Sequence, residues 1–124
     1  MDPAMKDRLQ FVKHQDQTIL VIDFGNCPKR DMFALLHLIQ ATIAEEQPHT
    51  VLTLVDFTGA HVDKEIAEEM KKILTLDRPY VKRSAWVGTS SLPKVFYENF
   101  KSFSQREFPT FGTRQAAMDW LVKE

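Results

Sequence analysis

The chain has 124 residues, of which 44% are hydrophobic and 27% charged, as expected for one globular domain that can bury a core. Sixteen Lys and Arg against seventeen Asp and Glu leave a net charge of −1, which argues against nucleic acid as a partner. A single cysteine, Cys27, excludes an internal disulfide and a thiolate metal cluster.

No apolar run approaches the roughly 18 residues of a membrane helix, and the polar start lacks a signal-peptide core. We therefore expect a single domain over residues 1–124 with no integral membrane segment, located in the cytoplasm.

The first half of the chain predicts a hairpin followed by a helix. Residues 9–14 partly alternate, 15–17 suit a turn, and the β-branched run 18–24 predicts a central strand. Gly25 to Pro28 break this strand, and the proline suits the first turn of a helix over 29–46. Its apolar positions recur at helical spacing: Met32, Leu35, Leu36, Ile39 and Ile43.

The middle of the chain predicts a strand, a helix and another strand. Residues 51–57 are apolar on both alternating faces apart from Thr53, which is typical of a parallel strand covered on two sides. Asp63 can cap a helix over 64–76, and residues 81–88 predict the next strand.

The last third predicts two more helices around an edge strand. Ser90 or Ser91 offers a hydroxyl cap for a helix over 92–103, whose predicted apolar face holds Phe96, Phe100 and Phe103. Residues 108–111 contain a proline and so fit only an edge strand, and Gly112-Thr113 caps a final helix. The order ββαβαβαβα predicts an α/β fold: a mainly parallel sheet with an N-terminal antiparallel hairpin and right-handed crossovers.

Three segments together resemble bacterial STAS/SEC14-type proteins, the SpoIIAA-like family. They are Val55-Asp56-Phe57-Thr58-Gly59, the stretch from Pro79 to Gly88, and Phe108-Pro109-Thr110-Phe111 followed by the helix around Trp120. The resemblance runs from about Thr18 to the end of the chain. It implies a SpoIIAA-like right-handed βα superhelix, shared by anti-sigma-factor antagonists and by lipid-carrying SEC14 domains, without implying one activity.

Antagonists of the sporulation type carry a phosphorylatable Ser or Thr in an Asp-Ser-Ser/Thr-Gly-like turn. The matching turn here keeps Asp56, Thr58 and Gly59 but has Phe57 between them, which makes Thr58 the candidate phosphoacceptor. A second alignment moves the acceptor into residues 60–63, which contain no hydroxyl. Many relatives also carry glycine at the position of Ser91.

Read from the residues alone, Asp56 and Thr58 could present a carboxylate and a hydroxyl near helix amides that favour an anion. A plain turn explains the same residues and is favoured. His61 and Asp63 lack the spacing of metal ligands, so we expect no metal and no cofactor. Lys71, Lys72, Arg78, Lys82 and Arg83 are diluted by Glu68, Glu69 and Asp77, which favours a solvated face.

No nucleophile, base and orienting group form a recognisable set, so we expect no enzyme. The sequence predicts a binding or regulatory domain that takes a protein partner or a small apolar, lipid-like ligand. The alternative is a phosphorylation-controlled antagonist-like regulator acting through Thr58. The candidate residues of the loops are Asp56, Thr58, Gly59, His61, Ser90 and Ser91, and those of an apolar groove or homodimer interface are Phe96, Phe100 and Phe103.

Overall fold

The computed structural model describes residues 3–123, so the expected domain extends past it at Met1, Asp2 and Glu124. The strands are β1 (Leu9–His14), β2 (Gln17–Asp23), β3 (Val51–Asp56), β4 (Val81–Val87) and β5 (Thr110–Phe111). The helices are α1 (Pro3–Asp7), α2 (Lys29–Ile43), α3 (Lys64–Asp77), α4 (Lys94–Ser104) and α5 (Arg114–Leu121), with a 3-10 turn η1 (Thr89–Ser91) before α4.

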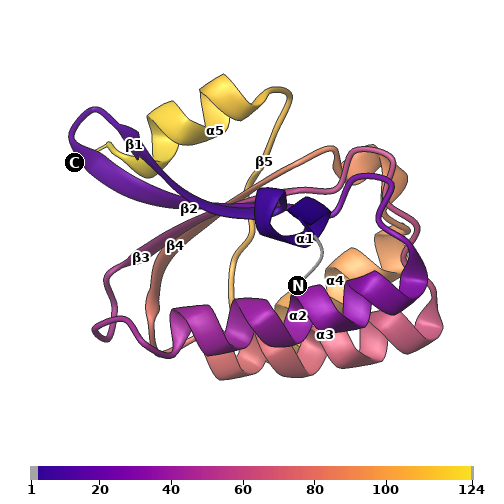
Figure 1. Cartoon of the computed structure of the whole chain (residues 1–124). Coiled ribbons are helices and arrows are strands. Elements are labelled where there is room, and N and C mark those ends of the chain that lie inside the picture. Colours follow the sequence, from indigo (N-terminus) through magenta and orange to yellow (C-terminus); the bar gives the residue numbers. More distant parts are fainter. Residues whose placement is uncertain (1–2, 124) are drawn as a thin grey trace.

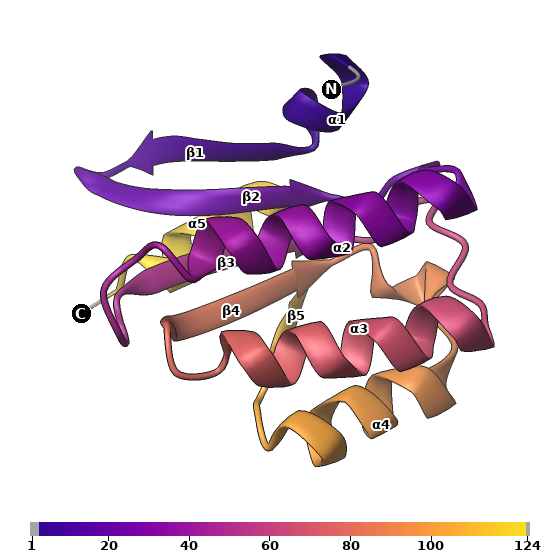
Figure 2. The same ribbon diagram turned by 60° about the horizontal axis from the view of Figure 1, so that its bottom comes forward.

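The five strands form one sheet in the order β1-β2-β3-β4-β5. The β1–β2 pair is antiparallel and the other pairs are parallel, as predicted. Figure 1 shows α5 on one face of the sheet and α2, α3 and α4 on the other. Turning the molecule brings these three helices side by side in front of the strands (Figure 2).

Every residue of β3 is buried, which fits a parallel strand covered on both faces. The core on the three-helix side contains an aromatic cluster centred on Trp86, which is 1% exposed. Its ring stacks on Phe108 at 4.2 Å between centroids and contacts Phe57 at 4.8 Å. This cluster anchors the segment after α4, which carries Phe108, to strand β4.

Helix boundaries follow local capping chemistry. The Asp63 side chain accepts a 2.9 Å hydrogen bond from the amide of Ile66, and the Thr113 hydroxyl accepts one of 3.1 Å from Ala116. Both caps were predicted. The predicted cap at Ser90 or Ser91 is wrong, because the residue that precedes α4 is Pro93 and no side chain caps that helix.

Two further differences concern the ends of the chain. The short helix α1 was not predicted, since five residues carry too little periodicity to reveal a helix. The strand expected over 108–111 shortens to Thr110–Phe111, at the sheet edge as its proline requires. No helix within residues 3–123 has the length and apolar character needed to cross a bilayer.

Candidate functional site

The loops that follow β2, β3 and β4 meet at the carboxyl ends of the parallel strands. The Asn26 amide donates to the Gly59 carbonyl at 3.2 Å, joining the first loop to the second. The Gly59 amide donates to the Ser91 hydroxyl at 3.3 Å, joining the second loop to the third. These bonds bring together segments that lie more than thirty residues apart in the sequence.

Asp56 ends β3, and both of its carboxylate oxygens accept hydrogen bonds. One oxygen accepts the Thr58 amide at 2.9 Å, and the other accepts Arg114 Nε at 2.8 Å. Arg114 also reaches Asp23 of the neighbouring strand, at 3.5 Å. Burial alone would raise the pKa of Asp56, but hydrogen bonds from Thr58 and Arg114 hold that pKa below its usual value. The carboxylate is therefore ionised and occupied, which suits a structural anchor.

Thr58 is exposed and packs closely against the end of the next strand. Gly88 has a φ of 70°, a left-handed conformation that favours glycine. A Cβ atom added at Gly88 would overlap the hydroxyl and amide of Thr58. The absence of a side chain at Gly88 thus sets how near the β3 and β4 ends can come.

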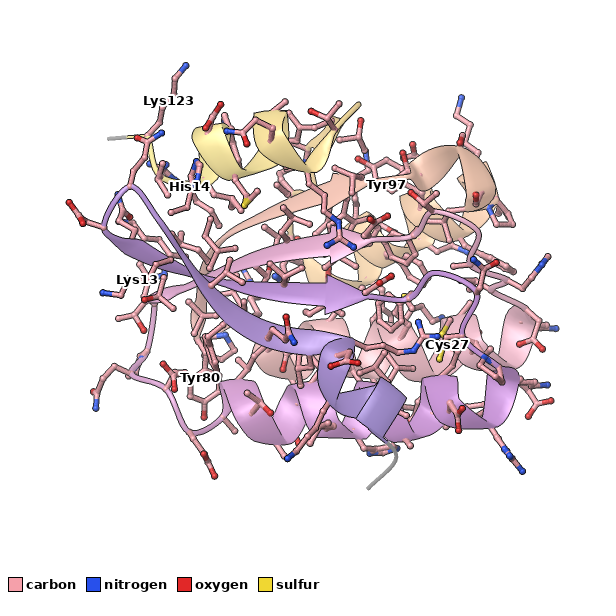
Figure 3. The ribbon with its side chains drawn as sticks, turned by 45° about the horizontal axis from the view of Figure 1, so that its top comes forward. Lys13, His14, Cys27, Tyr80, Tyr97 and Lys123 are labelled. Atoms are coloured by element: carbon pink, nitrogen blue, oxygen red, sulfur yellow. The ribbon has the colours of Figure 1, made fainter. Side chains whose placement is uncertain are left out.

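An open groove of about 570 Å³ runs between the first two loops and the start of α4. It brings His61 and Ser91 together with Asn26 and Pro93, whereas Asp56, Thr58, Gly59 and Ser90 lie outside its lining. Cys27 also lines the groove and is labelled in Figure 3, but its residue is only 6% exposed. Burial raises the pKa of the Cys27 thiol, more than the nearby Arg8 lowers it, so the neutral thiol is favoured.

The three phenylalanines of α4 occupy different environments. Phe100 is fully buried against Trp86, Phe96 is partly buried, and Phe103 is 54% exposed. The buried face of α4 runs through Phe100 and Ser104. Ser104 can be buried because its hydroxyl donates a hydrogen bond to the Phe100 carbonyl at 2.6 Å. Phe103 lies off that face, with the Lys71 ammonium 4.9 Å from its ring centre.

Sequence reasoning missed three residues of this region: Asn26, Gly88 and Arg114. A glycine that follows a buried strand was the available signal for Gly88. Asn26 also has a positive φ, of 53°, which asparagine tolerates better than most residues. Nothing local identifies Arg114, which reaches Asp56 from 58 residues away in sequence.

Comparisons with solved structures identify the type of fold. No family model matches the chain, and no curated protein matches it. Among solved structures, an uncharacterized DUF3478-family protein with a SpoIIAA-like fold from Shewanella loihica PV-4 is 22% identical. That alignment covers 92% of each chain with a TM-score of 0.71. An anti-sigma-factor antagonist (STAS) domain protein from Planctomyces limnophilus is 14% identical, over 93% of this chain and 98% of that one, with a TM-score of 0.60.

This chain therefore has a mixed α/β fold of the SpoIIAA-like type. Its fold is also similar to that of a STAS domain, which confirms the fold that the sequence resemblance predicted. At these identities the likeness establishes the fold, and the activity has to be argued from the surface itself.

Proposed function

We propose that this chain is a non-enzymatic binding domain that recognises a protein partner through its strand-end surface. This surface comprises Asn26, Thr58, His61, Ser90 and Ser91, all exposed polar residues. The observation that supports the proposal is the hydrogen bonding from Asn26 to Gly59 and from Gly59 to Ser91. A surface whose loops are joined by hydrogen bonds is preorganised, which lowers the entropy lost when a partner binds.

Binding is favoured over catalysis because Asp56 and Cys27, two groups suited to chemistry, are held in unreactive states. Both oxygens of Asp56 accept hydrogen bonds, from Thr58 and Arg114, and Cys27 is buried with a raised pKa. A carboxylate whose pKa is lowered is a weaker base, and a thiol nucleophile needs its thiolate form.

A protein partner is favoured over an enclosed lipid-like ligand because of the space available. The cavity between the sheet and helices α2 and α3 has about 30 Å³, whereas pockets for small molecules usually have several hundred. An apolar ligand would have to lie in the open groove beside His61 and Ser91 instead. Native mass spectrometry of the purified chain should accordingly show no bound lipid; a stoichiometric lipid adduct would favour the ligand reading.

Site-specific photo-crosslinking in the native cells tests the partner proposal. A crosslinking residue at His61 or Ser91 should give a discrete adduct with one protein. The same residue at Lys13, which is exposed on the hairpin strand β1, should not. Equal products from the hairpin position, or none from the strand-end positions, would refute the assignment.

Control by phosphorylation at Thr58 is the second candidate, favoured by the exposure of Thr58 at the loop. Phosphopeptide mapping of the chain from its native cells should then find phosphate on Thr58, and Thr58→Ala should remove it. Phosphate that persists elsewhere after this substitution would rule out Thr58 as the acceptor.

A homodimer through α4 is a further proposal, because Phe103 leaves a large apolar side chain exposed. Native mass spectrometry should show a dimer that Phe103→Ser reduces to monomer. A monomeric wild-type chain would contradict it.

A further inference from the structure

A second groove lies at the opposite end of the sheet from the strand-end surface, where the parallel strands begin. It has about 620 Å³ and is lined by residues of β4 and the loops around it. Five of its side chains are basic, and we call this set the basic groove: His49, Arg78, Lys82, Arg83 and Arg106. Among the described residues that line it, Glu107 is the one carboxylate, although the whole chain has a net charge of −1.

Two arginines of the basic groove are held in place by neutral acceptors. Arg106 donates to the Leu74 carbonyl at 2.9 Å and to the Ser84 hydroxyl at 2.8 Å. Arg83 donates to the carbonyls of Trp120, Leu121 and Lys123 at the end of α5. These bonds orient both guanidinium groups without neutralising their charge.

No carboxylate of residues 3–123 forms an ion pair with Arg78, Lys82, Arg83 or Arg106. By contrast, Lys71 and Lys72, which the sequence grouped with them, pair with Glu68 and Glu69 on α3. Among the described residues, the structure thus divides that basic stretch into a set on a helix that forms ion pairs and a set in a groove that forms none. The buried carboxylate of Asp77 acts on Arg106 from behind the groove, but it does not line the groove. Gathering like charges costs energy, which a bound anion would relieve.

The floor of the basic groove is the open edge of β4. Strand β5 pairs only with Trp86 and Val87, so the outer edge of the first part of β4 has no neighbouring strand. The Trp86 amide donates outward, to the Pro109 carbonyl at 2.9 Å. Because amides alternate in direction along a strand, the Ser84 amide also faces this edge and adds a neutral donor.

The walls of the groove also carry apolar groups, from Pro79, Pro109 and Trp120. From this combination we propose that the basic groove binds a small molecule that carries an oxyanion, phosphate or carboxylate, on a compact apolar group. The oxyanion lies against Arg78, Lys82 and Arg106, and the apolar group packs on Trp120 and the prolines. This site is separate from the strand-end surface and goes beyond the function proposed for it.

NMR of the tryptophan indole N–H signals tests the proposal with an internal control. The chain has two tryptophans: Trp120 lines the basic groove and Trp86 is 1% exposed in the core. Titration with phenyl phosphate should shift the Trp120 signal in a saturable way and leave the Trp86 signal unmoved. Trp120→Phe assigns the two signals.

Variants and related probes make the test specific. Arg78→Gln/Lys82→Gln removes two exposed cations and should weaken binding roughly threefold to tenfold, as expected for two exposed charge contacts. Lys13→Gln/Lys94→Gln changes the net charge equally at exposed positions outside the groove and should leave the affinity unchanged. Inorganic phosphate should bind more weakly than phenyl phosphate, and benzoate shows whether a carboxylate serves as well as a phosphate.

The proposal is overturned if the Trp120 signal shows no saturable shift with either phenyl phosphate or benzoate. It is also overturned if the two double variants weaken binding equally, because the effect would then come from net charge alone. Equal affinities for inorganic and phenyl phosphate would show that the apolar group of the ligand does not contribute to binding, which would overturn that part of the proposal.

Discussion

At the residue scale, Gly88 is the position where chain geometry is most restrictive. Its φ of 70° and the closeness of Thr58 leave no room for a Cβ atom. Gly112 offers a matched control, because a Cβ there would meet no atom within 4 Å. The contrast separates a steric requirement at a strand end from the general effect of replacing glycine.

We expect Gly88→Ala to lower the free energy of unfolding by more than about 1 kcal/mol, since the added methyl must displace Thr58 and occupy a strained conformation. Gly112→Ala should change it by less than that. Urea denaturation of both variants measures the difference. Equal effects would show that Thr58 can move aside with no loss in the free energy of unfolding.

Asp56 and Arg114 form the second residue-scale feature. The pair joins the end of β3 to the first residue of α5. Asp56→Asn should cost about 1.5–3 kcal/mol at neutral pH, the range for hydrogen bonds to charged groups. The low pKa of Asp56 contributes stability above the unfolded pKa, and this contribution is lost as pH falls through the folded value.

Urea denaturation of Asp56→Asn at neutral and at strongly acidic pH checks this prediction. The difference between the variant and the wild type should shrink toward acid, where the wild-type carboxyl is also neutral. A difference that stays constant with pH would mean that the charge of Asp56 is not what stabilises the pair.

At the element scale, α4 shows where periodicity predicts a helix correctly but assigns its buried face incompletely. Phe96, Phe100 and Phe103 follow helical spacing, so the sequence predicts that they share one apolar face, which could form a groove or an interface. The helix instead buries Ser104, whose hydroxyl bonds within its own turn, and leaves Phe103 outside. A periodicity analysis ranks residues by hydrophobicity. It therefore does not predict the burial of a serine whose hydroxyl bonds to a carbonyl of the same helix.

The two phenylalanines give a matched pair of substitutions. Phe100→Ala should cost about 3–5 kcal/mol, since it opens a cavity beside Trp86. Phe103→Ala should cost less than about 1 kcal/mol, because that side chain is 54% exposed. Thermal or urea denaturation compares them, at a protein concentration where both variants are monomeric. Similar losses would place Phe103 in a buried environment that the structure does not show.

At the scale of the whole molecule, the order of strands and most helices could be predicted from the sequence. Alternating strand and helix patterns demand a layered sheet, and the caps Asp63 and Thr113 have clear local signatures. The candidate loops could be predicted to lie at strand ends. Their mutual hydrogen bonds could not, because those depend on contacts such as Gly59 with Ser91, 32 residues apart.

The burial of Asp77 is another feature that the sequence pattern alone does not predict. The sequence groups it with the charged residues of a solvated face, yet it is only 3% exposed. Its Oδ1 atom has no hydrogen-bond partner among the described residues, and Arg106 is the nearby cation that acts on it. Its spacing of four residues from Ile73 places Asp77 on the buried face of α3, but a carboxylate at that position does not by itself indicate burial.

This buried acid should govern the pH dependence of stability. Burial, opposed by the charge of Arg106, raises the pKa of Asp77 from 3.8 to about 7. Between these values the native state keeps a proton that the unfolded chain has lost. The free energy of unfolding should therefore fall as pH rises from about 4 to about 7, by up to about 1.4 kcal/mol per pH unit from this group.

Asp77→Asn removes the titration while keeping the shape of the side chain, so it should flatten this slope and stabilise the protein at pH 7. Asp16→Asn makes the same change of charge at the exposed hairpin turn and should leave the slope as it is. Urea denaturation at several pH values between 4 and 8 measures all three proteins. A slope that survives Asp77→Asn would locate the linked proton elsewhere.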